Sequence, residues 1–182
     1  MAETKARIIE AGNRTFYGSG FNAVRVEDVL QEAEASRGSF YKFFDDKIGL
    51  AEEVLKTRAF QYEEFLSGAI KRSDGLAQGV TAIFLSLMEW SEIHGSHGCM
   101  FQTSKIELGD QPGVIGIAVE HKKAVWGILR EFLAREQYPE PELGASSLML
   151  LIEGAVAMAN FDAPQEQFLN ALDTAQKLFN LE

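Results

Sequence analysis

The sequence predicts an all-α protein with nine helices. Apolar residues recur at spacings of three and four along almost the whole chain, which is the period of a helix with one buried face. No stretch alternates between apolar and polar residues long enough to indicate a sheet, and glycine and proline gather between the helical runs. With 182 residues, of which 46% are hydrophobic, the chain can bury a sizeable core.

The first helix is expected at residues 4–19, with Thr4 as its cap and Gly20 as its end. Its inward face is expected to carry Ile8, Ile9, Gly12 and Phe16. Phe21 follows directly and is expected to be an apolar residue that closes the end of the core. A second helix of about nine residues then has apolar positions on one side, at Val26, Val29, Leu30 and Ala33.

A third, short helix is predicted from Ser36 to Phe44. Ser36 can accept a hydrogen bond from the free amides of the first turn, while Phe40 and Phe44 face the core that the first two helices create. Arg37 and Tyr41 must then point outward. Two helices joined by a tight turn, with the second presenting polar side chains to solvent, are typical of a helix-turn-helix that enters a groove of DNA.

These residues resemble the DNA-binding domain of the TetR family of bacterial repressors. The matching features are Gly20-Phe21, the stretch Ala33 to Ser36, the stretch Arg37 to Phe44, and Lys47 at the start of the fourth helix. The resemblance implies a three-helix, helix-turn-helix DNA-binding domain at residues 1–46. It also implies a helical ligand-binding and dimerisation domain at residues 47–182.

Three positions depart from the family pattern. Glu34 stands at the turn where the family usually has glycine, so we expect either an ordinary negative φ or a modest backbone strain there. The pair Val24-Arg25 stands where two hydroxyl residues are usual, and Arg25 could replace a hydroxyl's phosphate contact with a charged one. Lys42 stands where a histidine is frequent.

The net charge of −10 is unevenly divided along the chain. Residues 1–58 hold nine basic and ten acidic side chains, whereas residues 59–182 hold eight basic and seventeen acidic ones. Most of the excess negative charge therefore lies away from the expected DNA-binding surface. Four cations would form a local positive patch on that surface, as neutralisation of phosphates requires: Arg25, Arg37, Lys42 and Lys47. The alternative is that they are ordinary solvated charges.

The residues expected to contact DNA are Arg25, Ser36, Arg37, Ser39, Tyr41, Lys42 and Lys47. Arg37 and Ser39 are the candidates for base contacts, because the fork of an arginine matches the O6 and N7 acceptors of guanine. Tyr41, Lys42 and Lys47 resemble the phosphate anchors of the family, which fix register without reading sequence.

A long fourth helix is expected from Asp46 onward, and the remaining helices at 76–93, 99–108, 114–137, 142–160 and 165–180. The last two have the composition of an association surface for a homodimer, because the penultimate helix is apolar on nearly every side. The expected dimer contacts are Leu148, Leu151, Ile152, Ala155, Ala159, Phe168, Ala171, Leu172, Ala175, Leu178 and Phe179. The alternative is that both helices pack only within one chain. Two DNA-binding domains, however, need two-fold symmetry to bind a palindrome.

The middle segment, residues 60–134, mixes aromatic and polar side chains that could line a mostly apolar pocket for a small-molecule effector. The candidate ligand-binding residues are Phe84, Met88, Trp90, His94, Cys99, Phe101 and Trp126. The alternative is that these side chains form a stabilising core.

Cys99 is the single cysteine. The Gly98-Cys99 pair, followed by two apolar residues, resembles a TetR subgroup that includes electrophile-responsive repressors, in which a cysteine at a comparable place can act as the sensor. His94, His97 or the start of a helix could lower the pKa of the thiol. The alternative is a small buried hydrophobe.

These features predict a transcriptional repressor that a small molecule releases from a palindromic operator, with an electrophile or redox sensor acting through Cys99 as the alternative. A metal sensor using His94, His97 and Cys99 is a further alternative, but a fourth ligand is not obvious. No catalytic motif is found, so neither an enzyme nor a cofactor is expected. No apolar run of membrane-spanning length and no signal peptide are found, and one cysteine fits a reducing cytoplasm.

Overall fold

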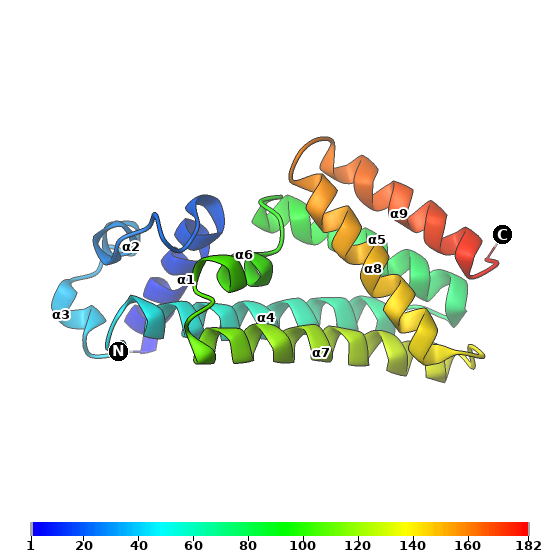
Figure 1. Ribbon diagram of the computed structural model, residues 1–182, viewed down its shortest axis with the longest axis horizontal. Helices are drawn as coiled ribbons and strands as arrows, with labels where there is room; N and C mark the ends of the chain where they lie inside the picture. The colour runs from blue at the N-terminus through cyan, green and yellow to red at the C-terminus, as the bar shows by residue number, and fades with distance from the viewer. Residues whose placement is uncertain (1, 182) are drawn as a thin grey trace. The chain divides into compact units, whose positions relative to one another are not determined.

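The computed structural model describes residues 2–181, and within them it has nine α-helices and no β-strand (Figure 1). The helices are α1 (Ala2–Ser19), α2 (Val26–Glu32), α3 (Arg37–Phe40), α4 (Lys47–Lys71), α5 (Gly75–His94), α6 (Met100–Glu107), α7 (Pro112–Arg135), α8 (Pro141–Ala159) and α9 (Pro164–Leu178). The predicted fold class is confirmed. From α5 onward, the ends of the helices differ from the expected ones by only one or two residues.

The chain divides into two compact units. The head unit contains the residues up to Gln61 together with Met100–His121, and the body unit contains Tyr62–Cys99 together with the residues from Lys122 onward. Both α4 and α7 therefore contribute to each unit. A domain boundary at the start of α4 stays a sequence-based prediction.

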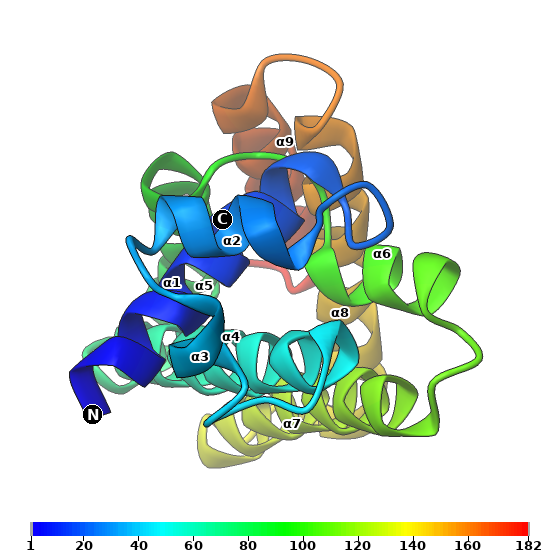
Figure 2. The same cartoon turned by 90° about the vertical axis from the view of Figure 1, so that its left-hand side faces the viewer.

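In the head unit, α1 packs against α2 and α3 (Figure 2). Ile8, Ala11 and Phe16 of α1 are buried, whereas Ile9 is only half-buried. Phe21 is buried just after α1, where its ring stacks on that of Phe16 with the ring centroids 5.0 Å apart. The periodic pattern therefore identified the inward face of α1, with Ala11 in place of Ile9.

Two helix boundaries in the head unit differ from the prediction. α1 already includes Ala2, so Thr4 lies inside the helix and does not cap it. α3 ends at Phe40 instead of Phe44, and residues 41–43 form turns. The backbone tightens after Phe40 into an i→i+3 hydrogen bond of 2.9 Å, and this bend brings Phe44 into the core.

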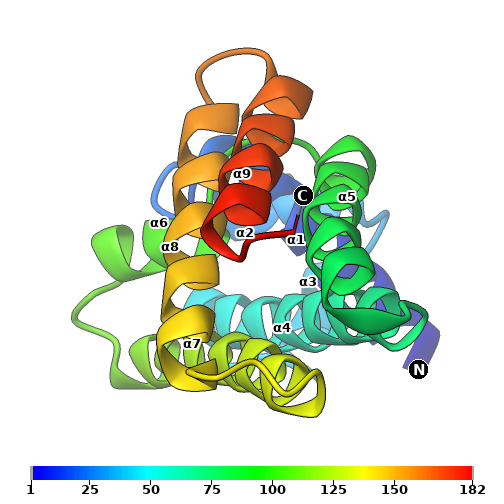
Figure 3. The same ribbon diagram turned by 90° about the vertical axis from the view of Figure 1, so that its right-hand side faces the viewer.

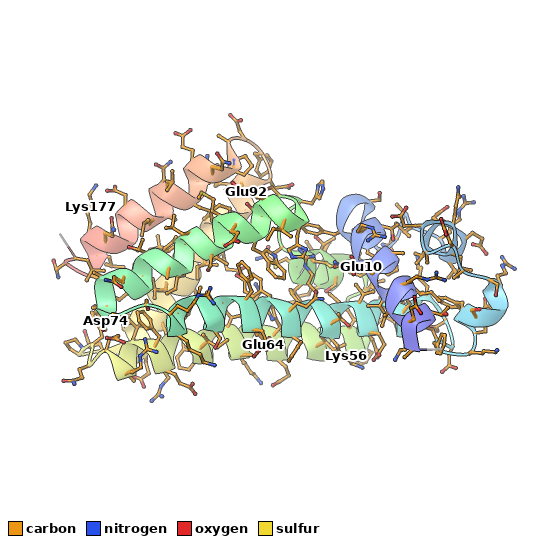
Figure 4. All side chains as sticks on the ribbon, turned by 180° about the vertical axis from the view of Figure 1, so that it is seen from behind. Glu10, Lys56, Glu64, Asp74, Glu92 and Lys177 are labelled. Carbon is orange, nitrogen blue, oxygen red and sulfur yellow. The ribbon has the colours of Figure 1, made fainter. Side chains whose placement is uncertain are left out.

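In the body unit, α9 packs against both α8 and α5 (Figure 3). The core of this unit is formed by side chains from α5, α7, α8 and α9, together with Leu66 and Ile70 of α4. The start of α9 is tied to the end of α5, because Gln165 Nε2 donates a hydrogen bond of 2.7 Å to Glu92 Oε1 (Figure 4).

Among the described residues, α8 is the one helix that is long and apolar enough to cross a membrane, with a mean hydropathy of 1.4. α8 is only weakly apolar and carries Glu142 and Glu153, so it is not a convincing membrane span. Core helices of proteins that never enter a membrane have the same composition. Only 33% of the most apolar window of α8 is buried within the chain, which leaves apolar surface to be covered by something else.

Candidate functional site

The turn after α2 places the N-terminal end of α3 at the surface of the head unit. Ser36 caps α3 as predicted, because its hydroxyl accepts a hydrogen bond of 3.1 Å from the Ser39 backbone N–H. The Ser36 and Ser39 hydroxyls also lie 3.0 Å apart. Both hydroxyls therefore help to fix the first turn of α3, and Ser39 is half-buried.

Besides the capping Ser36, four of the side chains that were predicted to contact DNA are exposed in the head unit. They are Arg25, Arg37, Tyr41 and Lys42. They supply two guanidinium groups, a phenol and an ammonium group. Groups of this kind donate hydrogen bonds to phosphate oxygens and to the acceptors on base edges.

Both arginines are paired with acids of α2. Arg37 Nη2 donates a hydrogen bond to Glu27 Oε1, and Arg25 Nε lies 3.5 Å from Asp28 Oδ2. The pKa of Glu27 lies below its ordinary value, first because its carboxylate accepts its own backbone N–H and then because Arg37 donates to it. The same hydrogen bond raises the pKa of Arg37. The patch that the sequence predicts to be positive is therefore partly neutralised within the chain.

Lys47 has contacts within the chain that the sequence did not predict. Its Nζ donates hydrogen bonds of 2.8 Å to the Phe21 carbonyl and 3.1 Å to the Val24 carbonyl. Lys47 therefore ties the start of α4 to the α1–α2 loop, residues 20–25. Its ammonium group therefore has a structural role, and its contact with a phosphate stays a prediction.

The α1–α2 loop is also held from α6. The Asn22 backbone N–H donates to Glu107 Oε2 at 2.6 Å, and Asn22 Nδ2 donates to the Glu107 carbonyl at 3.3 Å. Gly20 has a φ of +82°, and a Cβ on it would lie 2.6 Å from Glu107 Oε1. Position 20 therefore needs glycine for both its backbone conformation and its lack of a side chain.

The turn that ends α2 imposes a left-handed backbone on Glu34, whose φ is +48°. The Ala35 N–H donates to the Leu30 carbonyl at 2.9 Å, and the Glu34 N–H donates to the Gln31 carbonyl at 3.2 Å. This is the hydrogen-bond pattern of a Schellman motif, which usually has glycine at the left-handed position. Of the two predicted alternatives, ordinary negative φ is wrong and backbone strain is correct.

The residues predicted to bind a ligand are divided between the two units. Trp90 and His94 lie together in the body unit, with their ring centroids 4.0 Å apart. Phe84 is buried in the core of that unit. Phe101 belongs to the head unit, where its ring stacks on that of His121 with the centroids 3.9 Å apart.

The other two aromatic or apolar candidates pack at the margin of the body core. Met88 and Trp126 are partly buried against it, and Trp126 Nε1 donates to Ser146 Oγ at 3.2 Å. Two surface hollows lie within this unit, one of about 520 Å³ along α4 and α5 and one of about 430 Å³ between the end of α5 and the start of α9. None of the predicted ligand residues lines either hollow.

Cys99 lies beside two charged side chains of the body unit. Lys122 Nζ is 3.4 Å from Cys99 Sγ and also donates a hydrogen bond to Glu153 Oε1. Burial disfavours the charged form of Lys122, but its contacts with Cys99 and Glu153 favour that form and outweigh burial, so the pKa of Lys122 lies above its ordinary value. The sequence indicated histidines as neighbours of the thiol. It could not indicate Lys122, which is 23 residues away in the chain.

Metal ligands do not gather anywhere in the part of the chain that the structure describes. No three or more His, Cys, Asp or Glu side chains of residues 2–181 are arranged to hold an ion.

Most residues predicted for the dimer interface are instead buried in the core of their own chain. They are Leu148, Ile152, Ala155, Ala159, Phe168, Ala171, Leu172, Ala175 and Phe179. Leu151 is partly buried, and Leu178 is exposed. The prediction gave the main apolar stripe of each helix to a partner chain, but an amphipathic helix buries that stripe against its own unit first.

A second apolar row on α8 faces solvent. Leu143, Leu150 and Met158 are exposed and follow one another at intervals of seven and eight residues, which places them on one face of the helix. Gly154 lies on the same face, and nothing is within 4 Å of the position that a Cβ would occupy there. Phe161, just after the helix, is also exposed. A row of this kind indicates a surface that another molecule covers.

Comparison with known proteins relates these features to one family. Residues 8–54, from α1 into α4, match the profile described as "Bacterial regulatory proteins, tetR family". The HTH-type transcriptional repressor DhaR of Mycobacterium sp. (strain GP1) is 23% identical to the chain, over 94% of this chain and 92% of DhaR.

Solved structures show the same fold. SCO4454, a TetR-family transcriptional regulator from Streptomyces coelicolor, has a TM-score of 0.90 at 22% identity, over 99% of this chain and 96% of its own. The reduced form of E. coli NemR has a TM-score of 0.80 at 21% identity, over 96% of each chain.

Proposed function

We propose that this chain is a member of the TetR family of bacterial regulatory proteins, that it represses transcription as a homodimer on a palindromic operator, and that it leaves the operator when a small molecule binds. The observation that supports the DNA-binding part most directly is the geometry of α3. The helix is four residues long and is capped by Ser36; Arg37 at its start and Tyr41 directly after it are exposed to solvent.

The exposed residues of the head unit divide into two roles. Arg37 stands at the first position of α3, from which its guanidinium can donate to O6 and N7 of a guanine in the major groove. Tyr41, Lys42 and Arg25 are exposed and donate to phosphates, which sets the register of the head on the duplex without selecting a base.

Dimerisation would use the exposed row of α8, with Leu169 and Leu178 of α9 beside it. A homodimer with two-fold symmetry carries two identical heads and therefore reads an inverted repeat. The uncovered part of α8 supports this arrangement, because association removes its apolar side chains from water.

The effector would bind in the body unit and act in the cytoplasm. A ligand that prefers the DNA-free conformation by about 100-fold supplies about 2.7 kcal/mol, which lies within the usual range of coupling between two sites. Trp90 and His94 are the best placed of the candidate contacts, because their ring centroids lie only 4.0 Å apart.

Selection of duplexes from a random pool with the purified chain tests the DNA-binding proposal. We expect an inverted repeat to be enriched, and Arg37→Ala to lose preference at one base pair of each half-site. That loss should amount to about 1–3 kcal/mol. If no duplex is enriched at low ionic strength, the proposed function is wrong. An equal loss on all sequences would assign Arg37 to a phosphate.

Sensing through Cys99 is the second candidate, and the proximity of Lys122 favours it. The lysine ammonium lies 3.4 Å from the sulfur and donates a hydrogen bond to it, and a thiolate is the form of cysteine that reacts with electrophiles. The thiolate would add to the double bond of an electrophile such as N-ethylmaleimide. A carbon–sulfur bond then forms, and the neighbouring carbon takes a proton from water.

Mass spectrometry after brief N-ethylmaleimide treatment, with operator binding followed in parallel, tests this candidate. We expect Cys99 to be labelled, operator binding to be lost, and labelling to slow in Lys122→Met. An unlabelled Cys99, or a labelled protein that still binds its operator, excludes the sensor.

A further inference from the structure

We propose that Glu27 is a specificity-determining residue of the DNA-binding surface, because it fixes Arg37 in the position from which Arg37 reads a base. This inference rests on the proposed function. It gives an acidic side chain a part in DNA recognition, although an acid on such a surface is ordinarily expected only to repel phosphates.

Glu27 joins the N-terminal ends of the two helices of the motif. It is the second residue of α2, while Arg37 is the first residue of α3. The carboxylate of Glu27 accepts a hydrogen bond from Arg37 Nη2. This contact therefore links a side chain of α2 to the guanidinium at the start of α3.

Arg37 remains available to DNA while it is paired. Its side chain is 69% exposed, and only its Nη2 is hydrogen-bonded to Glu27. A guanidinium has five N–H donors, so the free edge can still approach the two acceptors of guanine. Because a long side chain loses rotamer freedom when it binds, an arginine that is already held loses less of it.

The same carboxylate disfavours binding to DNA through phosphate contacts alone. Glu27 is half exposed, and its negative charge lies beside the cation that would otherwise attract any phosphate. A guanine edge carries no net charge and is not repelled in this way. Glu27 therefore strengthens binding to the operator and weakens binding to unrelated duplexes, so both effects increase the ratio of the two affinities.

Glu27→Gln is the test, with Glu34→Gln as the matched control. Both variants remove one negative charge from the helix-turn-helix, but Glu34 forms no ion pair with any residue in 2–181, whereas Glu27 is paired with Arg37. Dissociation constants are measured for the selected operator and for a scrambled duplex of equal length. For Glu27→Gln we expect the affinity ratio to fall about three- to tenfold, as the loss of an exposed pair on each of two heads allows.

Glu34→Gln should strengthen binding to both duplexes by the same factor and leave the ratio unchanged. In an Arg37→Ala background, Glu27→Gln should behave as Glu34→Gln does, because its effect on the ratio requires Arg37. The inference is overturned if Glu27→Gln leaves the ratio unchanged or raises it, or if its effect persists without Arg37. Failure of the proposed function looks different, because the wild-type chain would then prefer no duplex.

Discussion

The left-handed backbone of Glu34 is a local strain that the turn after α2 imposes and that glycine would relieve. We expect Glu34→Gly to raise the free energy of unfolding by about 0.5 kcal/mol, because the relief of strain exceeds the added entropy of the unfolded chain. Urea denaturation of the two proteins measures this difference. Glu34→Ala is the control, since it removes the same charge but keeps a Cβ. An equal gain in both variants would trace the effect to charge.

Lys47 and Lys42 form a natural pair for separating structural from DNA-contacting cations. Lys47→Met removes the donor to the Phe21 and Val24 carbonyls, so the free energy of unfolding should fall by about 1–3 kcal/mol. Lys42→Met should leave stability unchanged. It should reduce the slope of log affinity against log salt concentration by the amount that corresponds to about one phosphate contact per protomer. Chemical denaturation and salt titrations distinguish them. If Lys47→Met proves neutral for stability, the two carbonyl contacts do not stabilise the fold.

At the scale of elements, the contact between α6 and the α1–α2 loop fixes part of the head unit. Glu107→Ala removes the acceptor of the Asn22 backbone N–H, so the amides of residues 20–25 should exchange with solvent faster. Glu107→Gln keeps an amide oxygen at the same place and should retain most of the protection. Hydrogen–deuterium exchange measured on the DNA-free protein compares the two. Equal exchange in both variants and the wild type would mean that Lys47 alone holds the loop.

The elements were predictable from the sequence because helix periodicity and capping are local. The spacing of apolar residues identified the helices, and Ser36 was identified as a cap from its position alone. The end of α3 was missed because it depends on where Phe44 packs, which is a tertiary effect.

The contacts of the candidate site were less predictable, because they join residues that are far apart in the chain. Glu107 lies 85 positions from Asn22, and Lys47 lies 26 from Phe21. No periodicity connects such pairs. Charge counts gave a positive patch, but they could not show that Arg25 and Arg37 are each paired with an acid on α2.

At the scale of the whole molecule, the composition of α8 and α9 indicated association, but it could not tell which of two apolar faces is available. A helix that is apolar on both sides gives one face to its own core, and only packing decides which one. The buried stripe is the more continuous of the two, so the sequence pointed to it. The exposed row around Leu150 is the one that a second chain can reach.

Leu150→Glu tests the assembly, because Leu150 is 76% exposed in the middle of that row. A charge there stays solvated in a monomer but is desolvated in a dimer. The dissociation constant of the dimer should therefore rise at least tenfold, while each chain stays folded. Analytical ultracentrifugation measures the association, and circular dichroism checks the fold.

The matched control is Leu85→Glu, the same change at an exposed leucine of α5. A Leu150→Glu protein that associates as tightly as wild type would exclude this face of α8 from the interface. Operator affinity should fall together with dimerisation, because a single head contacts only one half-site.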